Sequence, residues 1–120
     1  MMKFYKTQDE QGLFRETNKL EKGCWINLVN PTVQEINTLC NSIGVLEEFL
    51  RYPLDQEERA RNDIEDDQTL ILIDIPVTEK SDTGVNGFST IPLGMIVVRD
   101  DYFITASPAH YILLHIQSSA

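Results

Sequence analysis

Between residues 24 and 44, the spacing of the apolar side chains changes from the alternation of a β-strand to the period of an α-helix. The alternation over Cys24–Val29 places three side chains on each face of a predicted strand. Asn30 and Pro31 end this strand. Asn30 can cap a helix that begins at Pro31, because the first residue of a helix has no partner for a backbone N–H. A strand that leads directly into a helix is typical of an α/β fold.

The helix that follows has a second candidate start one residue later. Thr32 and Glu35 have the spacing of a capping box, in which each side chain accepts a hydrogen bond from the backbone of the other residue. Apolar side chains then recur at helical spacing at Val33, Ile36, Leu39, Cys40 and Ile43. Gly44 is a natural stop, since glycine adopts the left-handed conformation that often follows a helix.

Strand patterns flank this unit on both sides. They cover Met2–Thr7, Leu13–Thr17, Asn62–Asp67 (an edge strand or a turn), Thr69–Pro76, Phe88–Val98 and Tyr102–Ala106. Thr69–Pro76 does not alternate, which predicts a strand buried on both faces at the centre of the sheet. Pro92 indicates an edge position or a bulge, because proline cannot donate to a strand ladder. Trp25 is expected inside the core.

Two more helices and one long loop complete the expected order of elements. Leu46–Tyr52 predicts a short helix that Pro53 ends, and Thr78–Asn86 predicts a polar loop. Ser107 and Pro108 predict the start of a last helix, which residues 110–117 continue. The sequence therefore predicts a single α/β domain over residues 1–120, with a mixed sheet covered by helices on both faces, an α/β/α sandwich.

The net charge of −9 excludes some classes of partner. Such a surface repels phosphate groups, so neither nucleic acid nor an anionic lipid surface is an expected partner. No segment reaches the ~20 apolar residues of a membrane helix, so we expect the chain to be soluble and to stay in the cytosol. Cys24 and Cys40 lie in apolar patterns and are expected to be free, buried thiols.

The excess acid is concentrated in one stretch of thirteen residues. The candidate metal ligands are Asp55, Glu57, Glu58, Asp63, Glu65, Asp66 and Asp67. Hard cations such as Mg²⁺ prefer these oxygen ligands, although their spacing matches no known metal loop. The alternative is a solvated polar face, in which Arg59 and Arg61 pair with neighbouring acids.

No pattern of catalytic residues stands out, and we expect the chain not to be an enzyme. The hydroxyl groups of Ser89, Thr90 and Ser107 lie near strand ends, but no base is placed beside them by the sequence. His110 and His115 are five residues apart, which does not put them on the same face of a helix. Cys24 lies within a predicted strand and is therefore a weak candidate for a catalytic nucleophile. Asp74 is expected to be an ordinary hydrogen-bonded carboxylate at a strand end.

Several segments, in order, resemble the N-terminal domain of CorA-type magnesium and cobalt transporters. They are Trp25–Thr32 with Glu35 and Ile36, Leu54–Arg61 with Glu65 and Asp66, Leu72–Pro76, Ile91–Ile96, and Phe103–Ala106. Each segment is short, but together they span residues 24 to 107 in the order of the family.

The resemblance implies a role in a homopentameric channel for Mg²⁺ that often passes Co²⁺. The N-terminal domain of that family lies at the cytoplasmic face of the membrane, and Mg²⁺ bound between neighbouring subunits holds the pore shut. The family's Gly-Met-Asn pore motif and its membrane helices are not in this sequence. The chain would then be the regulatory, Mg²⁺-sensing domain, and alone it would bind Mg²⁺ only weakly.

One position departs from the family. The resemblance implies a sensing carboxylate shortly before Leu54–Arg61, and alignment places Tyr52 there. Glu47, Glu48 and Asp55 are nearby acids that do not align with it. Two other functions stay open: a stand-alone acidic module of the same fold that binds a basic protein, and a small hydrolase.

Overall fold

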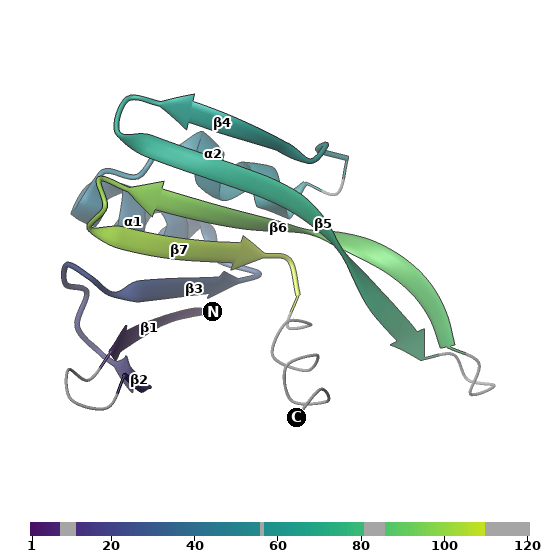
Figure 1. The fold of residues 1–120 in the computed structure, drawn as a ribbon, viewed down its shortest axis with the longest axis horizontal. Helices are drawn as coiled ribbons and strands as arrows, with labels where there is room; N and C mark the ends of the chain where they lie inside the picture. The colour runs from purple at the N-terminus through teal and green to yellow at the C-terminus, as the bar shows by residue number, and fades with distance from the viewer. Residues whose placement is uncertain (8–11, 56, 81–85, 110–120) are drawn as a thin grey trace.

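In the computed structural model, residues 1–7, 12–55, 57–80 and 86–109 are described, and within them seven strands form one sheet (Figure 1). The strands are β1 (Met2–Thr7), β2 (Phe14–Thr17), β3 (Trp25–Val29), β4 (Arg61–Glu65), β5 (Gln68–Lys80), β6 (Asn86–Val98) and β7 (Tyr102–Ser107). Their order is β2-β1-β3-β7-β6-β5-β4. β3 and β7 run parallel, and the other neighbouring pairs are antiparallel, so the sheet is mixed as expected.

The described helices lie on one face of this sheet, behind it in the view of Figure 1. They are α1 (Val33–Ile43), α2 (Glu47–Arg51) and the 3-10 helix η1 (Tyr52–Leu54). Pro53 therefore lies within a helical turn and does not end the helical segment. The last helix, expected after Ser107 and Pro108, falls on residues 110–117, outside the described part. The second helical layer of the sandwich remains a prediction.

The capping box is the correct start of α1. Thr32 Oγ1 accepts a hydrogen bond from the N–H of Glu35 (3.1 Å), and Glu35 Oε1 accepts one from the N–H of Thr32 (2.9 Å). The alternative start at Asn30 is wrong, because Asn30 is in a left-handed turn with φ of 44°. Gly44 ends the helix with φ of 74°, as its residue type predicts.

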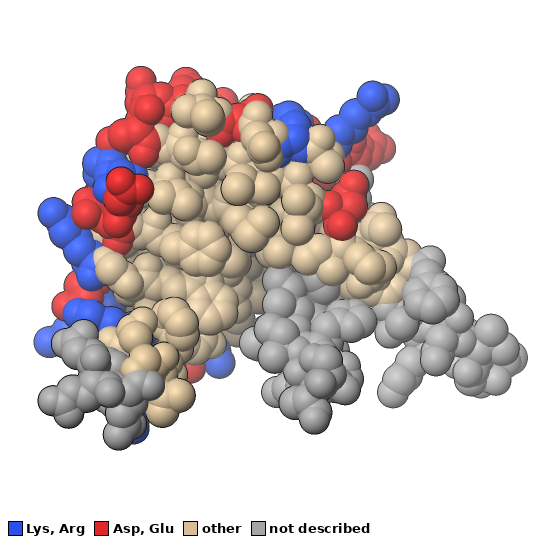
Figure 2. All heavy atoms as spheres, in the orientation of Figure 1, with Lys and Arg blue, Asp and Glu red and all other residues tan. Residues whose placement is uncertain are grey.

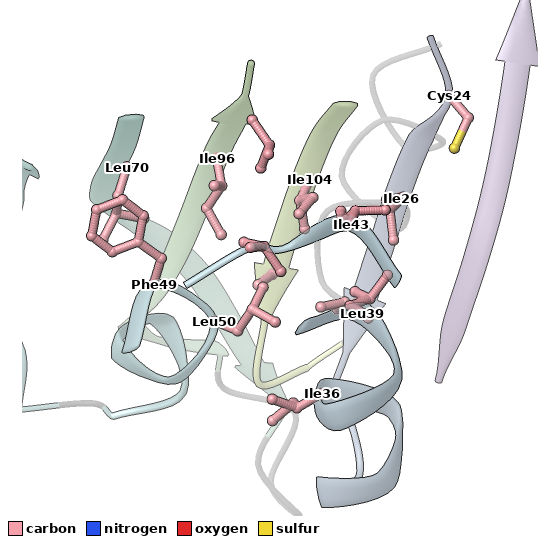
Figure 3. Close-up of a cluster of buried hydrophobic side chains, with 14 of the residues drawn as sticks. Cys24, Ile26, Ile36, Leu39, Ile43, Phe49, Leu50, Leu70, Ile96 and Ile104 are labelled. Carbon is pink, nitrogen blue, oxygen red and sulfur yellow. The ribbon is translucent and has the colours of Figure 1, made fainter. Parts of the chain in front are cut away.

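The core lies between the helices and the sheet, as Figure 3 shows for its central side chains. It is formed by side chains from β3, β5, β6 and β7 on one side and from α1 and α2 on the other. Its fully buried members include Ile26, Leu28, Ile36, Leu39, Phe49, Leu50, Leu70, Leu72, Ile96 and Ile104. Gly94 of β6 packs directly against the ring of Pro53 in η1, which brings the helical segment close to the sheet.

Burial along β5 differs from the prediction for Thr69–Pro76. Leu70 and Leu72 are buried against the helices, whereas Ile71 and Ile73 on the opposite face are only partly buried. The strand is next to the edge strand β4 and not at the centre of the sheet. The prediction was wrong because α1 and α2 cover only one face of the strand. An apolar run in the sequence does not indicate which faces of a strand are covered.

Two further expectations need correction. Trp25 is half-buried on the face opposite the helices, so it lies outside the main core. Thr78–Lys80 extends β5 and does not belong to a loop, while residues 81–85 of that expected loop lie outside the described part. Pro92 is at a local edge, as expected, because β7 pairs with β6 only from Gly94 onward. The β5–β6 register continues through Pro92 without a bulge.

Candidate functional site: the acidic edge

The seven acidic residues singled out in the sequence lie along one border of the sheet, and we call them the acidic edge. Asp55 follows η1, Glu57 and Glu58 lie in the connection to β4, and Asp63 and Glu65 belong to β4. The remaining two, Asp66 and Asp67, form the turn between β4 and β5. Charged side chains on an edge strand also prevent edge-to-edge pairing with other chains, so part of this charge has a structural explanation.

Arg61 at the start of β4 binds two acids of this edge. Its Nη1 donates to Glu58 Oε2, and its Nε lies 3.0 Å from Asp63 Oδ2. The guanidinium group also stacks over the ring of Tyr52, 4.6 Å from the ring centroid. The hydrogen bonds to Glu58 and Asp63 raise the pKa of Arg61 above its already high ordinary value. Glu58 and Asp63 are therefore largely neutralised within the chain.

Glu65 is in a different situation, because it faces another acid. The negative charge of Glu48 on α2, together with a hydrogen bond between the two side chains, raises the pKa of Glu65. Tyr52 also contacts Glu48, with its hydroxyl 3.5 Å from Glu48 Oε2. Burial and the charge of Glu48 both raise the pKa of Tyr52, so its hydroxyl stays protonated and donates to Glu48. Among the described residues of the acidic edge, only Glu65 has a carboxyl pKa that is raised by an acid from another element. That acid is Glu48 of α2.

The other acids do not meet at a common point. Asp55 Oδ1 accepts from the N–H of Glu57 at 2.9 Å, which closes a local turn. Asp67 Oδ2 is 4.0 Å from Arg99 Nη1, and Asp66 is in a left-handed turn with φ of 53°. An open depression of about 650 Å³ lies beside Asp55 and residues 57–61. Within the described residues, however, no three Asp, Glu, His or Cys side chains are close enough together to hold a metal ion.

The alternative of a solvated polar face is realised in part. Arg61 pairs with neighbouring acids as that alternative expects, whereas exposed Arg59 makes no salt bridge to any other described residue. Glu48 was not among the candidate ligands predicted from the sequence. The sequence does show two adjacent acids, Glu47 and Glu48, in the first turn of α2. It does not show that this turn lies beside β4.

The side chains considered for catalysis are dispersed in the part of the chain that the structure describes. Ser107 is buried and its Oγ donates to the carbonyl of Ala109 at 3.1 Å. Cys24 is buried and burial raises the pKa of its thiol, which disfavours the reactive thiolate. Cys40 is a half-buried free thiol, and Asp74 is exposed on β5. His110 and His115 lie outside the described residues.

Among the described helices, none combines the length and the apolar character that crossing a membrane requires. Comparison by sequence adds nothing, since no family model matches the chain and no curated protein matches it.

The solved structures that share the fold include two of CorA. The soluble domain of CorA from Methanocaldococcus jannaschii is 18% identical, with a TM-score of 0.74, and the match covers 99% of this chain and 45% of that one. The complete CorA magnesium transporter from the same organism is 15% identical, with a TM-score of 0.69, and the match covers 99% of this chain and 36% of that one. This chain spans less than half the length of either structure. It has the fold of the CorA soluble domain.

Proposed function

We propose that this chain is the N-terminal regulatory domain of a CorA-like channel or transporter for Mg²⁺, and that it lies on the cytoplasmic side of the membrane. The observation that carries the proposal is the structural match to the CorA soluble domain over 99% of the chain. The ordered series of sequence segments from Trp25 to Ala106 supports it independently. In this proposal the chain works as part of a homopentamer, and it has no catalytic activity of its own.

The acidic edge supplies the part of this chain that would respond to Mg²⁺. Mg²⁺ requires octahedral geometry and keeps several of its water molecules, so it needs only one or two protein carboxylates. The Glu48–Glu65 pair offers two carboxylates from different elements, held beside each other despite their repulsion. A divalent cation would relieve that repulsion. Glu58 and Asp63 are less suitable ligands, because Arg61 already neutralises them.

A site between subunits would explain why the described carboxylates of one chain do not form a complete set. Among the described residues no group of three ligands is present, so the remaining ligands would come from a neighbouring subunit. Tyr52, which the resemblance aligns with the family's sensing carboxylate, would act indirectly by orienting Glu48 through its hydroxyl group.

The experiment is an uptake assay on the full-length protein, reconstituted in vesicles with Mg²⁺ on the inside. The double variant Glu48→Gln with Glu65→Gln should conduct at internal Mg²⁺ concentrations that close the wild-type protein. The matched control is Glu16→Gln, which removes an exposed carboxylate of β2, at the opposite end of the sheet from β4, and should close normally. Normal closure of the double variant would show that the sensing carboxylates lie elsewhere, and the absence of any Mg²⁺ flux in the wild-type protein would refute the transport function.

A further inference from the structure

The connection between α1 and α2 is short, and its backbone needs hydrogen-bond partners from outside the two helices. α1 ends at Ile43 and α2 begins at Glu47, so residues 44–46 join them. The last carbonyl groups of one helix and the first N–H groups of the next have no partner inside a helix. α1 has no basic side chain in its last turn, and Leu46, the N-cap of α2, makes no side-chain cap. Among the described residues, two side chains from the sheet and its turns supply partners instead.

Gln68, the first residue of β5, binds this connection through its side-chain amide. Its Nε2 donates to the carbonyl of Gly44 at 2.8 Å, and its Oε1 accepts from the N–H of Leu46 at 2.9 Å. Gln68 is only 5% exposed, so a lost partner would leave polar groups unpaired in a largely buried place, which costs free energy. Leu46 directly precedes α2. Gln68 thereby holds the N-terminal end of α2 against the start of β5.

Arg99, in the turn between β6 and β7, holds the other end of the connection. Its Nη2 donates to the carbonyl of Ile43, the last residue of α1, at 2.6 Å. Its backbone N–H donates to the carbonyl of Asp67 at 3.0 Å, which joins the β6–β7 turn to the β4–β5 turn. Both ends of the connection are thus attached to the same end of the sheet. Of these two attachments, Gln68 is the one that lies next to α2.

Strand register places Glu65 directly across from Gln68. The two residues pair in the β4–β5 hairpin, and paired residues of neighbouring strands have their side chains on the same face of a sheet. For Gln68 this is the face that the helices cover, because its amide binds the connection between them. Glu65 therefore points toward the helices from β4, where it meets Glu48 in the first turn of α2. Gln68 is thus linked to both carboxylates, to Glu65 by strand pairing and to Glu48 through Leu46.

Glu48 and Glu65 need such a restraint, because two carboxylates that are free to move separate under their mutual repulsion. Figure 2 shows acidic side chains along the border formed by β4 and the β4–β5 turn, so the pair lies among further negative charge. α2 has five residues and no side-chain cap, and a helix this short is not stable by itself. Its two buried side chains attach its middle to the core. The hydrogen bond from Leu46 to Gln68 attaches the end at which Glu48 lies.

We propose that Gln68 is the positioning residue of the Glu48–Glu65 pair, and that its amide sets the distance between the two carboxylates by fixing the first turn of α2 against β5. Gln68 acts through α2 and does not bind a cation itself, because both polar atoms of its amide are already used in hydrogen bonds to the backbone. Residues that orient metal ligands in this way contribute about tenfold or more to metal affinity. The inference rests on the proposed function where it concerns Mg²⁺, whereas the positioning itself can be measured in the 120-residue chain alone.

The first measurement is NMR spectroscopy of the 120-residue chain, in which the side-chain carboxyl signal of Glu65 is followed against pH. Gln68→Met keeps the approximate length and volume of the side chain and removes both hydrogen bonds. Gln68→Asn is a second variant, which keeps the amide but is too short to bridge the same two backbone groups. In both variants the pKa of Glu65 should fall toward the ordinary glutamate value, because Glu48 moves away from it. The N–H of Leu46 should exchange with solvent on the order of tenfold faster, because it loses its acceptor.

The matched control is Ile104→Val, which lowers stability without touching α2. It removes one methyl group from a fully buried side chain of β7, so it separates a general loss of stability from a loss of positioning. The pKa of Glu65 should stay raised in this control. A pKa that stays raised in both Gln68 variants as well, or a Leu46 N–H that exchanges no faster in them, would overturn the proposal.

The second measurement is the uptake assay on the full-length protein with Mg²⁺ on the inside. Gln68→Met should need about tenfold more internal Mg²⁺ for closure than the wild-type protein, whereas Ile104→Val should close at the wild-type concentration. A Glu65 pKa that falls in Gln68→Met without any change in closure would support the positioning role and contradict the sensing role of the Glu48–Glu65 pair. The two proposals can therefore fail separately.

Discussion

Glu48 and Glu65 face each other from α2 and β4, and the repulsion between them is a local cost in the folded chain. The pKa of Glu65 is raised by Glu48 in the folded state, so the folded state binds protons more tightly there than the unfolded chain does. The stability linked to this group is present below the ordinary glutamate pKa and is lost as the pH rises through the raised value. At neutral pH the repulsion between the two carboxylates therefore weakens the folded state.

Glu48→Gln removes the repulsion and should raise the melting temperature at neutral pH. The amide oxygen of the new side chain can still accept the hydrogen bond from Tyr52, so the local structure is retained. The gain should disappear at a pH below the ordinary glutamate pKa, where Glu65 is protonated in both states. Thermal melts of both proteins at several pH values measure this difference. A gain that is equal at acidic and neutral pH would show that charge repulsion is not its cause. Glu47→Gln is the matched control, because Glu47 pairs with Arg51 and not with Glu65.

At the scale of the elements, η1 packs directly against β6 at Gly94. A Cβ atom added to Gly94 would lie 2.9 Å from Pro53 Cβ and nearer still to Pro53 Cγ. Gly94→Ala should therefore cost about 1–3 kcal/mol of unfolding free energy, as overpacking of a core does. Pro53→Ala in the same chain removes the overlapping ring and should recover much of that loss. Chemical denaturation of the single and double variants measures the coupling, and strictly additive effects would contradict the contact.

Burial along β5 and β6 predicts which apolar residues matter most for stability. Ile96→Ala should cost about 2–5 kcal/mol, because Ile96 is fully buried between the sheet and the helices. Ile73→Ala should cost clearly less unfolding free energy, because Ile73 is partly exposed on the face of the sheet opposite α1 and α2. Denaturant melts of the two variants compare them directly. Equal losses of stability would mean that the face of the sheet opposite α1 and α2 is as well covered as the face that these helices pack against.

Most elements could be predicted from local patterns, because hydrophobic period, caps and turn residues act over a few positions. The capping box of Thr32 with Glu35 and the stop at Gly44 are examples that the structure confirms. The two-sided burial predicted for Thr69–Pro76 was wrong, because burial depends on which layers cover the strand. That information lies in contacts between distant segments, and a run of isoleucine and leucine does not contain it.

The sequence showed where the acidic residues gather, but not how their side chains are arranged after folding. Seven acids lie within thirteen residues, yet only Asp63 and Glu65 share a strand face, and the other five lie in the turns on either side of β4. Arg61 neutralises two of them, and the acid that shifts the pKa of Glu65 comes from α2. Proximity in the sequence identifies a charged segment, whereas a binding site depends on which side chains converge after folding.

At the scale of the whole molecule, the isolated chain should bind Mg²⁺ only weakly. A ligand at 100 times its dissociation constant stabilises a protein by about 2.7 kcal/mol, which would shift the melting temperature by several degrees. At millimolar Mg²⁺ we expect a smaller shift, matched by Ca²⁺ and by a monovalent salt at equal ionic strength, since screening is not selective. Thermal melts with each salt, repeated on the double variant Glu48→Gln with Glu65→Gln, test this. A saturable, Mg²⁺-selective shift that disappears in the variant would show that one chain holds a complete site.

The central claim is that this fold serves a CorA-like transporter, and the sequence of the gene beyond codon 120 tests it most directly. The match covers 36% of the complete CorA structure, so a long remainder is expected if the two proteins correspond. We predict that the reading frame continues and encodes two apolar segments of about 20 residues each, long enough to cross a membrane, with Gly-Met-Asn after the first. A reading frame that ends close to Ala120, or that continues without such segments, would contradict the transporter and leave a domain of the same fold with another function.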